Sequence, residues 1–134
     1  MIEKQFALDT NILIYLEGND PAKRKIAESL LSLDPVIPSQ VIFEFINVTR
    51  RLRNIPKRQL IKEAADLFRH CSIAPVYHST LVLAENLVQK YDFQLFDSFI
   101  VASAFEAGCD ILYSEDIQHN MTVREQIRII NPFY

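Results

Sequence analysis

Short apolar runs alternate with longer amphipathic stretches along the whole chain. The apolar runs predict buried strands at residues 4–9, 36–38, 72–76, 109–116 and 126–133. Helical spacing of apolar residues covers residues 10–18, 22–33, 40–53, 57–70 and 78–91, and a last helix runs from near Asp97 to Gly108. Strands that alternate with helices in this way predict an α/β fold, with a parallel sheet covered by helices on both faces.

Several residues mark where the predicted helices begin and end. Asp20 and Pro21 begin the second helix, and Pro56 begins the fourth. Ser39 is a candidate cap for the third helix, and Gly108 fits a left-handed residue that ends the last one.

Composition favours one domain with one core, because the chain has 134 residues of which 49% are hydrophobic. Only Gly18 and Gly108 are present, so no glycine-rich loop is available to bind a nucleotide phosphate. Cys71 and Cys109 lie far apart without metal-ligand spacing, which argues against a disulfide framework or a zinc site. The net charge of -3 gives no sign of polyanion binding by itself.

The chain has no apolar run near the ~20 residues that span a bilayer, and its first residues lack the pattern of a signal peptide. We therefore expect a soluble, cytoplasmic protein with no membrane association.

Asp97 stands at the start of an otherwise apolar run, FIVASAFEAG, where burying a charge is costly unless something pairs with it. Two other acids follow predicted strands: Asp9 ends the first, and Asp116 closes the strand CDILYSED. In open parallel sheets, ligands bind beyond the carboxyl ends of the strands. The helix that Asp97 begins starts at this same edge, so these three acids are expected to converge there.

Glu44 lies on a polar stripe of an otherwise apolar helix, together with Gln40, Asn47 and Arg51. Taken singly, each acid has an ordinary explanation as a helix-terminal, turn or solvent-facing residue. Taken together, close carboxylates raise one another's pKa unless a cation neutralises them. Mg²⁺ or Mn²⁺ prefers such oxygen ligands and can activate water toward a phosphodiester, which points to hydrolysis of phosphate esters.

Three segments in this order and spacing resemble a PIN domain, specifically a VapC-type toxin ribonuclease. They are FALDTNILIY, SQVIFEFINV and LFDSFIVASAFEAGCDILYSEDIQH. The resemblance covers essentially the whole chain, and it implies a single PIN domain over residues 1–134. It also implies a three-layer α/β/α sandwich with a mainly parallel five-stranded sheet in the order 3-2-1-4-5.

The same resemblance implies a metal-dependent endoribonuclease, the toxin of a toxin-antitoxin pair, that forms a homodimer and is silenced by a cognate antitoxin. Asn11 and Ser114 would be supporting polar residues. Mg²⁺ or Mn²⁺ would be held by the catalytic acids Asp9, Glu44, Asp97 and Asp116.

Other features near these segments stay open. Asn120 replaces a glycine common in relatives, Phe96 replaces Trp or Tyr, and neither a role for Glu115 nor one for His119 can be assigned. A basic cluster could contact RNA phosphates or simply be a solvated turn; its members are Arg50, Arg51, Arg53, Lys57 and Arg58.

Three other kinds of protein are alternatives to a ribonuclease. An inactive PIN fold that only binds a partner or dimerises keeps the same acids. A haloacid-dehalogenase-type phosphatase would need a DxD motif, whereas the chain has Asp9-Thr10-Asn11, and a receiver domain would need an acid pair and a lysine that are missing.

Overall fold

Six strands form one sheet in the computed structural model, which describes residues 5–134. The strands are β1 (Phe6–Leu8), β2 (Val36–Pro38), β3 (Ser72–Ala74), β4 (Ile111–Tyr113), β5 (Thr122–Val123) and β6 (Ile127–Ile130). They lie in the order β3-β2-β1-β4-β6-β5, and every pair is parallel except β5 with β6. The mainly parallel sheet with β1 near its centre is therefore confirmed.

The predicted order of five strands is also confirmed once β6 is counted as the fifth, but the sheet has a sixth strand that the sequence did not indicate. Strand β5 is two residues long and joins β6 through a tight turn in which both Arg124 and Glu125 have positive φ, at 51° and 59°. Turns of this kind usually carry Asn-Gly or Asp-Gly. Arg-Glu gives no such signal, so the hairpin was missed.

The strands are shorter than predicted at several ends. The run predicted from residue 4 begins at Phe6, and Lys4 lies outside the described residues. Strand β4 stops at Tyr113, so Asp116 follows the strand rather than ending it. The segment that carries Asp116 therefore has no regular structure to hold it.

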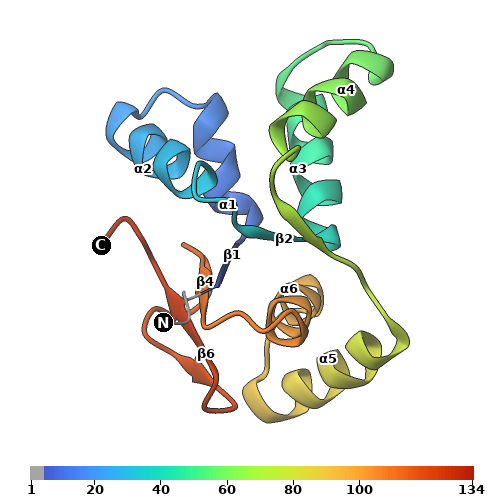
Figure 1. The fold of residues 1–134 in the computed structure, drawn as a ribbon, viewed down its shortest axis with the longest axis vertical. Helices are drawn as coiled ribbons and strands as arrows, with labels where there is room; N and C mark the ends of the chain where they lie inside the picture. The colour runs from blue at the N-terminus through green and yellow to red at the C-terminus, as the bar shows by residue number, and fades with distance from the viewer. Residues whose placement is uncertain (1–4) are drawn as a thin grey trace.

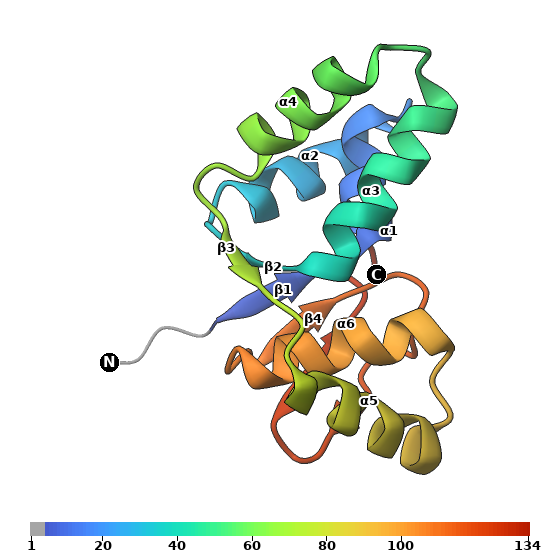
Figure 2. The same cartoon turned by 90° about the vertical axis from the view of Figure 1, so that its right-hand side faces the viewer.

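Helices cover both faces of the sheet, which confirms the three-layer sandwich. They are α1 (Thr10–Ile14), the 3-10 turn η1 (Tyr15–Glu17), α2 (Pro21–Leu31), α3 (Ser39–Leu52), α4 (Lys57–Leu67), α5 (His78–Tyr91) and α6 (Leu95–Glu106). Helices α1 to α4 lie on one side of the strands and α5 and α6 on the other (Figures 1 and 2). None of the helices in the described part of the chain is both long and apolar enough to cross a membrane.

Two predicted helix caps, Asp20 and Ser39, have different outcomes in the structure. Asp20 caps α2 by accepting a hydrogen bond from the Lys23 backbone N–H at 3.2 Å, as predicted. The cap assigned to Ser39 is wrong: Pro38 precedes α3, and the Ser39 hydroxyl instead donates to the Ala74 carbonyl at 3.0 Å. Ser39 thus links α3 to the edge strand β3.

Helix α6 is buried on nearly every side because it packs between the sheet and α5. Its buried residues are Ser98, Ile100, Val101, Ala102, Ser103 and Ala104, whose mostly small side chains allow close approach. The apolar run after Asp97 is explained by this position, and Asp97 itself lies in the first turn, where α6 emerges at the carboxyl edge of the sheet.

Gly108 ends α6 as predicted, with φ of +79°. Its N–H donates to Phe105 O and the N–H of Cys109 donates to Ala104 O, both at 3.0 Å. These two bonds form a Schellman motif, which needs a left-handed residue at this position. The turn leads the chain directly into β4.

We expect Gly108→Ala to lower the free energy of unfolding by about 1–2 kcal/mol, because a Cβ disfavours positive φ. An added Cβ would meet only the Gln5 side chain at 3.9 Å, so the cost is backbone strain rather than a clash. The matched control is Gly18→Ala, since Gly18 has φ of -97° and room for a Cβ. Urea denaturation would measure the unfolding free energy of both variants. Equal values would contradict the expected backbone strain at position 108.

Candidate functional site

A cavity of about 300 Å³ lies at the carboxyl edge of the sheet. Helices α1, α3 and α6 and the segment after β4 all contribute to its walls. Four carboxylates from separate parts of the chain are among its lining residues, which are Asp9, Thr10, Asn11, Ile14, Glu44, Asn47, Val48, Asp97 and Asp116. The structure therefore brings together all four acids that the sequence singled out.

Asp9 is the most deeply buried of the four, with 4% of its surface exposed. Strands β1 and β4 pair with Leu8 opposite Tyr113, so the next residues, Asp9 and Ser114, lie side by side. The Asp9 backbone N–H donates to Tyr113 O at 2.9 Å, and the Ser114 hydroxyl donates to Asp9 Oδ2 at 2.7 Å. The register of the sheet thus sets the place of this carboxylate.

Three donors hold the Asp9 side chain in one orientation. Thr10 N–H donates to Oδ1 at 2.7 Å, and Asn11 Nδ2 donates to Oδ2 at 3.2 Å, beside the bond from Ser114. Asn11 Nδ2 also reaches Ser114 Oγ at 3.4 Å. Asn11 and Ser114 therefore support Asp9 directly in the structure.

Glu44 reaches the cavity from the second turn of α3. Its Oε1 accepts a hydrogen bond from the Thr10 hydroxyl at 2.7 Å, and its Oε2 accepts from Gln40 Nε2 at 3.3 Å. Thr10 is thereby bonded to two of the acids, through its N–H to Asp9 and its hydroxyl to Glu44. This link was not predicted from the sequence, where its only signal is the position of Thr10 between Asp9 and Asn11.

Two of the four carboxylates, Asp9 and Asp97, have raised pKa values. Burial raises the pKa of Asp9 from 3.8 to about 6, and the charges of Asp97 and Glu44 add to this effect against the hydrogen bonds from Ser114 and Thr10. Burial also raises the pKa of Asp97, helped by the charges of Glu44 and Asp116. The ion pairs within residues 5–134 leave these four acids out, so no Lys or Arg relieves the repulsion.

The donor set matches a hard divalent cation, because carboxylate oxygens predominate and the negative charge is uncompensated. The acids surround the cavity rather than closing on one point: no three acidic, histidine or cysteine side chains in residues 5–134 form a ready-made metal cage. A cavity of this size has room for water as well as an ion, and Mg²⁺ usually keeps several waters. The residues thus fit such a cation in charge and donor type.

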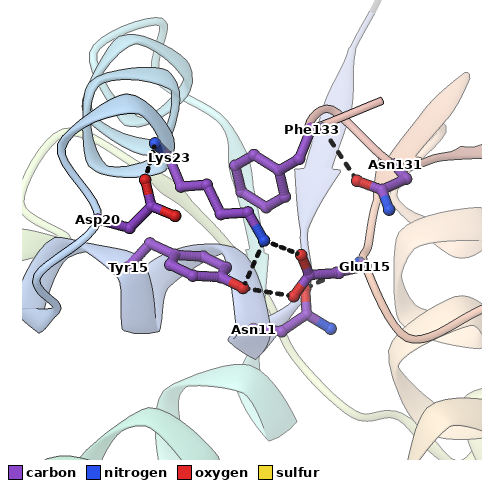
Figure 3. Close-up of polar contacts among 7 residues, drawn as sticks. All are labelled: Asn11, Tyr15, Asp20, Lys23, Glu115, Asn131 and Phe133. Atoms are coloured by element: carbon purple, nitrogen blue, oxygen red, sulfur yellow. Dashed lines mark hydrogen bonds and ion pairs between the residues drawn. The ribbon is translucent and has the colours of Figure 1, made fainter.

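Glu115 points away from the cavity, although it precedes Asp116 directly. Its carboxylate is bound on the other side of the segment by Tyr15 OH at 2.6 Å and by Lys23 Nζ at 2.8 Å (Figure 3). Lys23 and Tyr15 lower the pKa of Glu115 through these hydrogen bonds. Glu115 does not line the acidic cavity.

His119 does not line the acidic cavity either. Its Nδ1 accepts a hydrogen bond from the Asn131 N–H at 2.9 Å, and its ring stacks on Tyr134 with centroids 4.2 Å apart. Asn120 adopts φ of +65°, the left-handed conformation expected of a residue that replaces glycine. Phe96 is exposed beside Asp97.

The members of the basic cluster differ in whether they have partners inside the fold. Arg53 lies between Glu17 and Glu63, at 3.7 and 3.2 Å, and ties η1 to α4. Arg50 donates to Asn47 Oδ1 at 2.7 Å, next to the cavity that Asn47 lines. Arg51, Lys57 and Arg58 are exposed, and they take no part in the ion pairs found within residues 5–134.

A larger hollow of about 870 Å³ lies at the opposite edge of the sheet, where Phe6, Val36 and Ser72 begin their strands. It lacks a comparable convergence of carboxylates, since Asp34 and Glu106 are its only acidic lining residues in the described part of the chain. Chemistry therefore favours the smaller cavity as the functional site.

Solved structures of similar fold include a toxin-antitoxin complex from Klebsiella pneumoniae, with a TM-score of 0.72 and 18% identity over 96% of this chain and 98% of that one. VapC20 of Mycobacterium tuberculosis, described as a Sarcin-Ricin loop cleaving toxin, has a TM-score of 0.66 and 18% identity over 84% and 90%. FitAcB from Neisseria gonorrhoeae has a TM-score of 0.67 and 13% identity over 97% and 99%. At these identities the likeness concerns the fold.

No curated protein sequence gives a significant match to the chain. The family model of the PIN domain, in contrast, matches residues 6–122, from the first residue of β1 to the first residue of β5. This span includes every acid of the cavity and the strands and helices that position them. The chain therefore belongs to the PIN domain family.

Proposed function

We propose that this protein is a metal-dependent endoribonuclease, the toxin of a toxin-antitoxin pair, and that residues 1–134 form a single PIN domain. The observation that carries the proposal is the convergence of four carboxylates on one cavity, without a basic partner among residues 5–134. The similar fold of VapC20 and of toxin-antitoxin complexes supports it. Membership of the PIN family argues against the phosphatase and receiver-domain alternatives.

The residues of the cavity would have two roles, to hold a cation and to orient the residues that hold it. Asp9, Glu44, Asp97 and Asp116 would hold Mg²⁺ or Mn²⁺ directly or through water. Such a cation, when bound, lowers the pKa of water and offsets charge on a phosphodiester. Asn11 and Ser114 keep the Asp9 carboxylate pointed into the cavity, and Thr10 does the same for Glu44. Hydrolysis would leave a 5′-phosphate and a 3′-hydroxyl, with no protein nucleophile.

RNA is the proposed substrate, and a homodimer silenced by a cognate antitoxin is the proposed assembly. Arg50 and Arg51 lie about two turns beyond Glu44 on α3. Arg51, Lys57 and Arg58 are exposed and available for phosphates. Arg53 is engaged by Glu17 and Glu63, so we propose a smaller part for it in RNA contact.

We expect Asp97→Asn to abolish calorimetric Mn²⁺ binding and to lower cleavage of single-stranded RNA by more than about 100-fold, because a ligand charge is lost while the side-chain shape is kept. Asp92→Asn is the matched control: Asp92 is exposed and lies outside the cavity. Cleavage by the wild type should stop when a chelator is added.

Two results would contradict this assignment. Wild-type cleavage by Asp97→Asn would remove that residue from the site. Mn²⁺ binding without cleavage of any RNA by the wild type would favour the inactive PIN fold that only binds a partner.

We expect the contribution of Asp9 to the stability of the metal-free protein to be lost as the pH rises from about 4 to 7. The folded state holds the Asp9 proton more tightly than the unfolded chain, so this contribution is complete below 3.8 and is lost as the pH passes about 6. A shift of this size corresponds to about 3 kcal/mol. Asp9→Asn should remove the effect, so in chelator its stability relative to the wild type should rise over this pH range.

Chemical denaturation of both proteins at several pH values measures this difference, and Mn²⁺ at neutral pH should stabilise the wild type but not Asp9→Asn. A stability difference between the two that stays constant from pH 4 to 7 would show that burial does not shift the pKa of Asp9.

Two arginines of the basic cluster should behave oppositely. Arg51→Gln should weaken RNA binding and reduce its dependence on salt while leaving the unfolding free energy unchanged, since the side chain is exposed. Arg53→Gln should lower the unfolding free energy by up to about 1 kcal/mol and leave the salt dependence unchanged, because its pairs with Glu17 and Glu63 are partly exposed. Equal effects of the two substitutions on RNA binding would refute the division.

A further inference from the structure

The segment that carries Asp116 has no regular structure to hold it in place. Strand β4 ends at Tyr113, and residues 114–121 form bends and turns before β5 begins at Thr122. Asp116 is itself exposed, unlike Asp9. The position of its carboxylate relative to the other acids must therefore come from contacts made by neighbouring residues.

Glu115 is held at both its backbone and its side chain. Its N–H donates to Asn11 Oδ1 at 3.0 Å, and Asn11 in turn donates to Asp9 Oδ2. Its carboxylate accepts hydrogen bonds from Tyr15 OH at 2.6 Å and Lys23 Nζ at 2.8 Å (Figure 3). One residue thus ties the segment both to Asp9 and to the helices on one face of the sheet.

Lys23 is the centre of this arrangement. Its Nζ also donates to Tyr15 OH at 3.1 Å, and it lies 4.7 Å from the centroid of the Tyr15 ring and 5.1 Å from that of Phe133. The Tyr15 and Phe133 rings meet edge to face, with centroids 4.9 Å apart. The Lys23 and Glu115 side chains are 33% and 25% exposed, so the pair is shielded more than an ordinary surface ion pair.

Charge gives a second reason for the contact. Glu115 is a fifth carboxylate next to four that already repel one another. Lys23 neutralises Glu115 outside the cavity. Of the two adjacent acids Glu115 and Asp116, only Asp116 then lines the cavity with Asp97. Without Lys23, nothing in residues 5–134 would pair with the Glu115 charge, because Tyr15 is its other side-chain partner there.

We propose that Lys23 is a positioning residue for the metal site: by binding Glu115 it fixes the segment 114–116 and presents the Asp116 carboxylate to the cavity. Lys23 does not line the cavity and acts through Glu115 alone. This inference rests on the proposed function as far as the cation is concerned, whereas the ordering of the segment does not depend on it.

The test uses Lys23→Met with Lys25→Met as the matched control, since Lys25 lies on the same helix, is exposed and makes none of the ion pairs found within residues 5–134. Besides the Glu115 N–H, the Ile117 N–H reports on the segment, since it donates to Ser114 Oγ at 3.3 Å. In metal-free protein, we expect amide hydrogen exchange of Glu115 and Ile117 to be about tenfold faster in Lys23→Met and unchanged in Lys25→Met. The calorimetric Kd for Mn²⁺ should rise about tenfold in Lys23→Met alone.

Two further variants separate positioning from a general loss of stability. Gly108→Ala destabilises the fold far from the cavity and should leave the Kd for Mn²⁺ unchanged. Lys23→Arg keeps the charge and should recover most of the Mn²⁺ affinity. Recovery by Lys23→Arg with no effect of Gly108→Ala would be the pattern of a positioning residue.

Unchanged exchange at Glu115 and Ile117 in Lys23→Met would overturn the inference. Equal Mn²⁺ affinities of Lys23→Met and Lys25→Met, in a protein whose wild type binds Mn²⁺, would overturn it as well. A wild type that binds no Mn²⁺ would instead refute the proposed function, and the exchange rates would still decide whether Lys23 orders the segment.

Discussion

The burial of Asp9 among other acids is the constraint on which the rest of the site depends. A carboxylate with 4% of its surface exposed loses most of its hydration, and Asp97 and Glu44 add repulsion. Hydrogen bonds from Thr10, Asn11 and Ser114 stabilise the charged form. They offset the desolvation only in part, because the pKa of Asp9 still lies near 6. The folded chain therefore keeps an unsatisfied negative charge at one place.

The sheet determines where that charge lies. Strand β1 has parallel neighbours on both sides, so its carboxyl end is surrounded by the segments that follow β2 and β4. The segment after β2 becomes α3 and supplies Glu44, whereas the segment after β4 supplies Ser114 and Asp116. Helix α6 ends at Glu106, and the chain turns at Gly108 into β4, so the helix starts at the same edge with Asp97. Strand order and register thus bring together acids that are distant in the sequence.

Much of this arrangement could be predicted because it follows from local patterns. Apolar runs located the main strands, and acids at strand and helix ends located the edge where the cavity lies. The failures have a different physical origin. The Arg124-Glu125 turn adopts positive φ without the usual residues, and Ser39 bonds to Ala74 instead of capping α3. Tertiary contacts override local preference at both places.

Partners of charged side chains were the hardest feature to predict. In the sequence, Arg53 belongs to a basic cluster, but in the structure it forms ion pairs with Glu17 and Glu63. The bond between Thr10 and Glu44 joins residues 34 apart, and that between Lys23 and Glu115 joins residues 92 apart. Local periodicity predicts neither pairing, because both depend on how two distant segments of the chain pack together.

The contrast between Glu115 and Asp116 shows how such pairings decide function. Ser114 contacts Asp9 and Asp116 lines the cavity, while Glu115 between them turns toward α2. Two adjacent carboxylates with the same intrinsic chemistry thus differ in role, because Lys23 meets one of them and the uncompensated acids around Asp9 meet the other. What makes an acid a candidate ligand here is the lack of a basic partner within the described fold as much as its place in the motif.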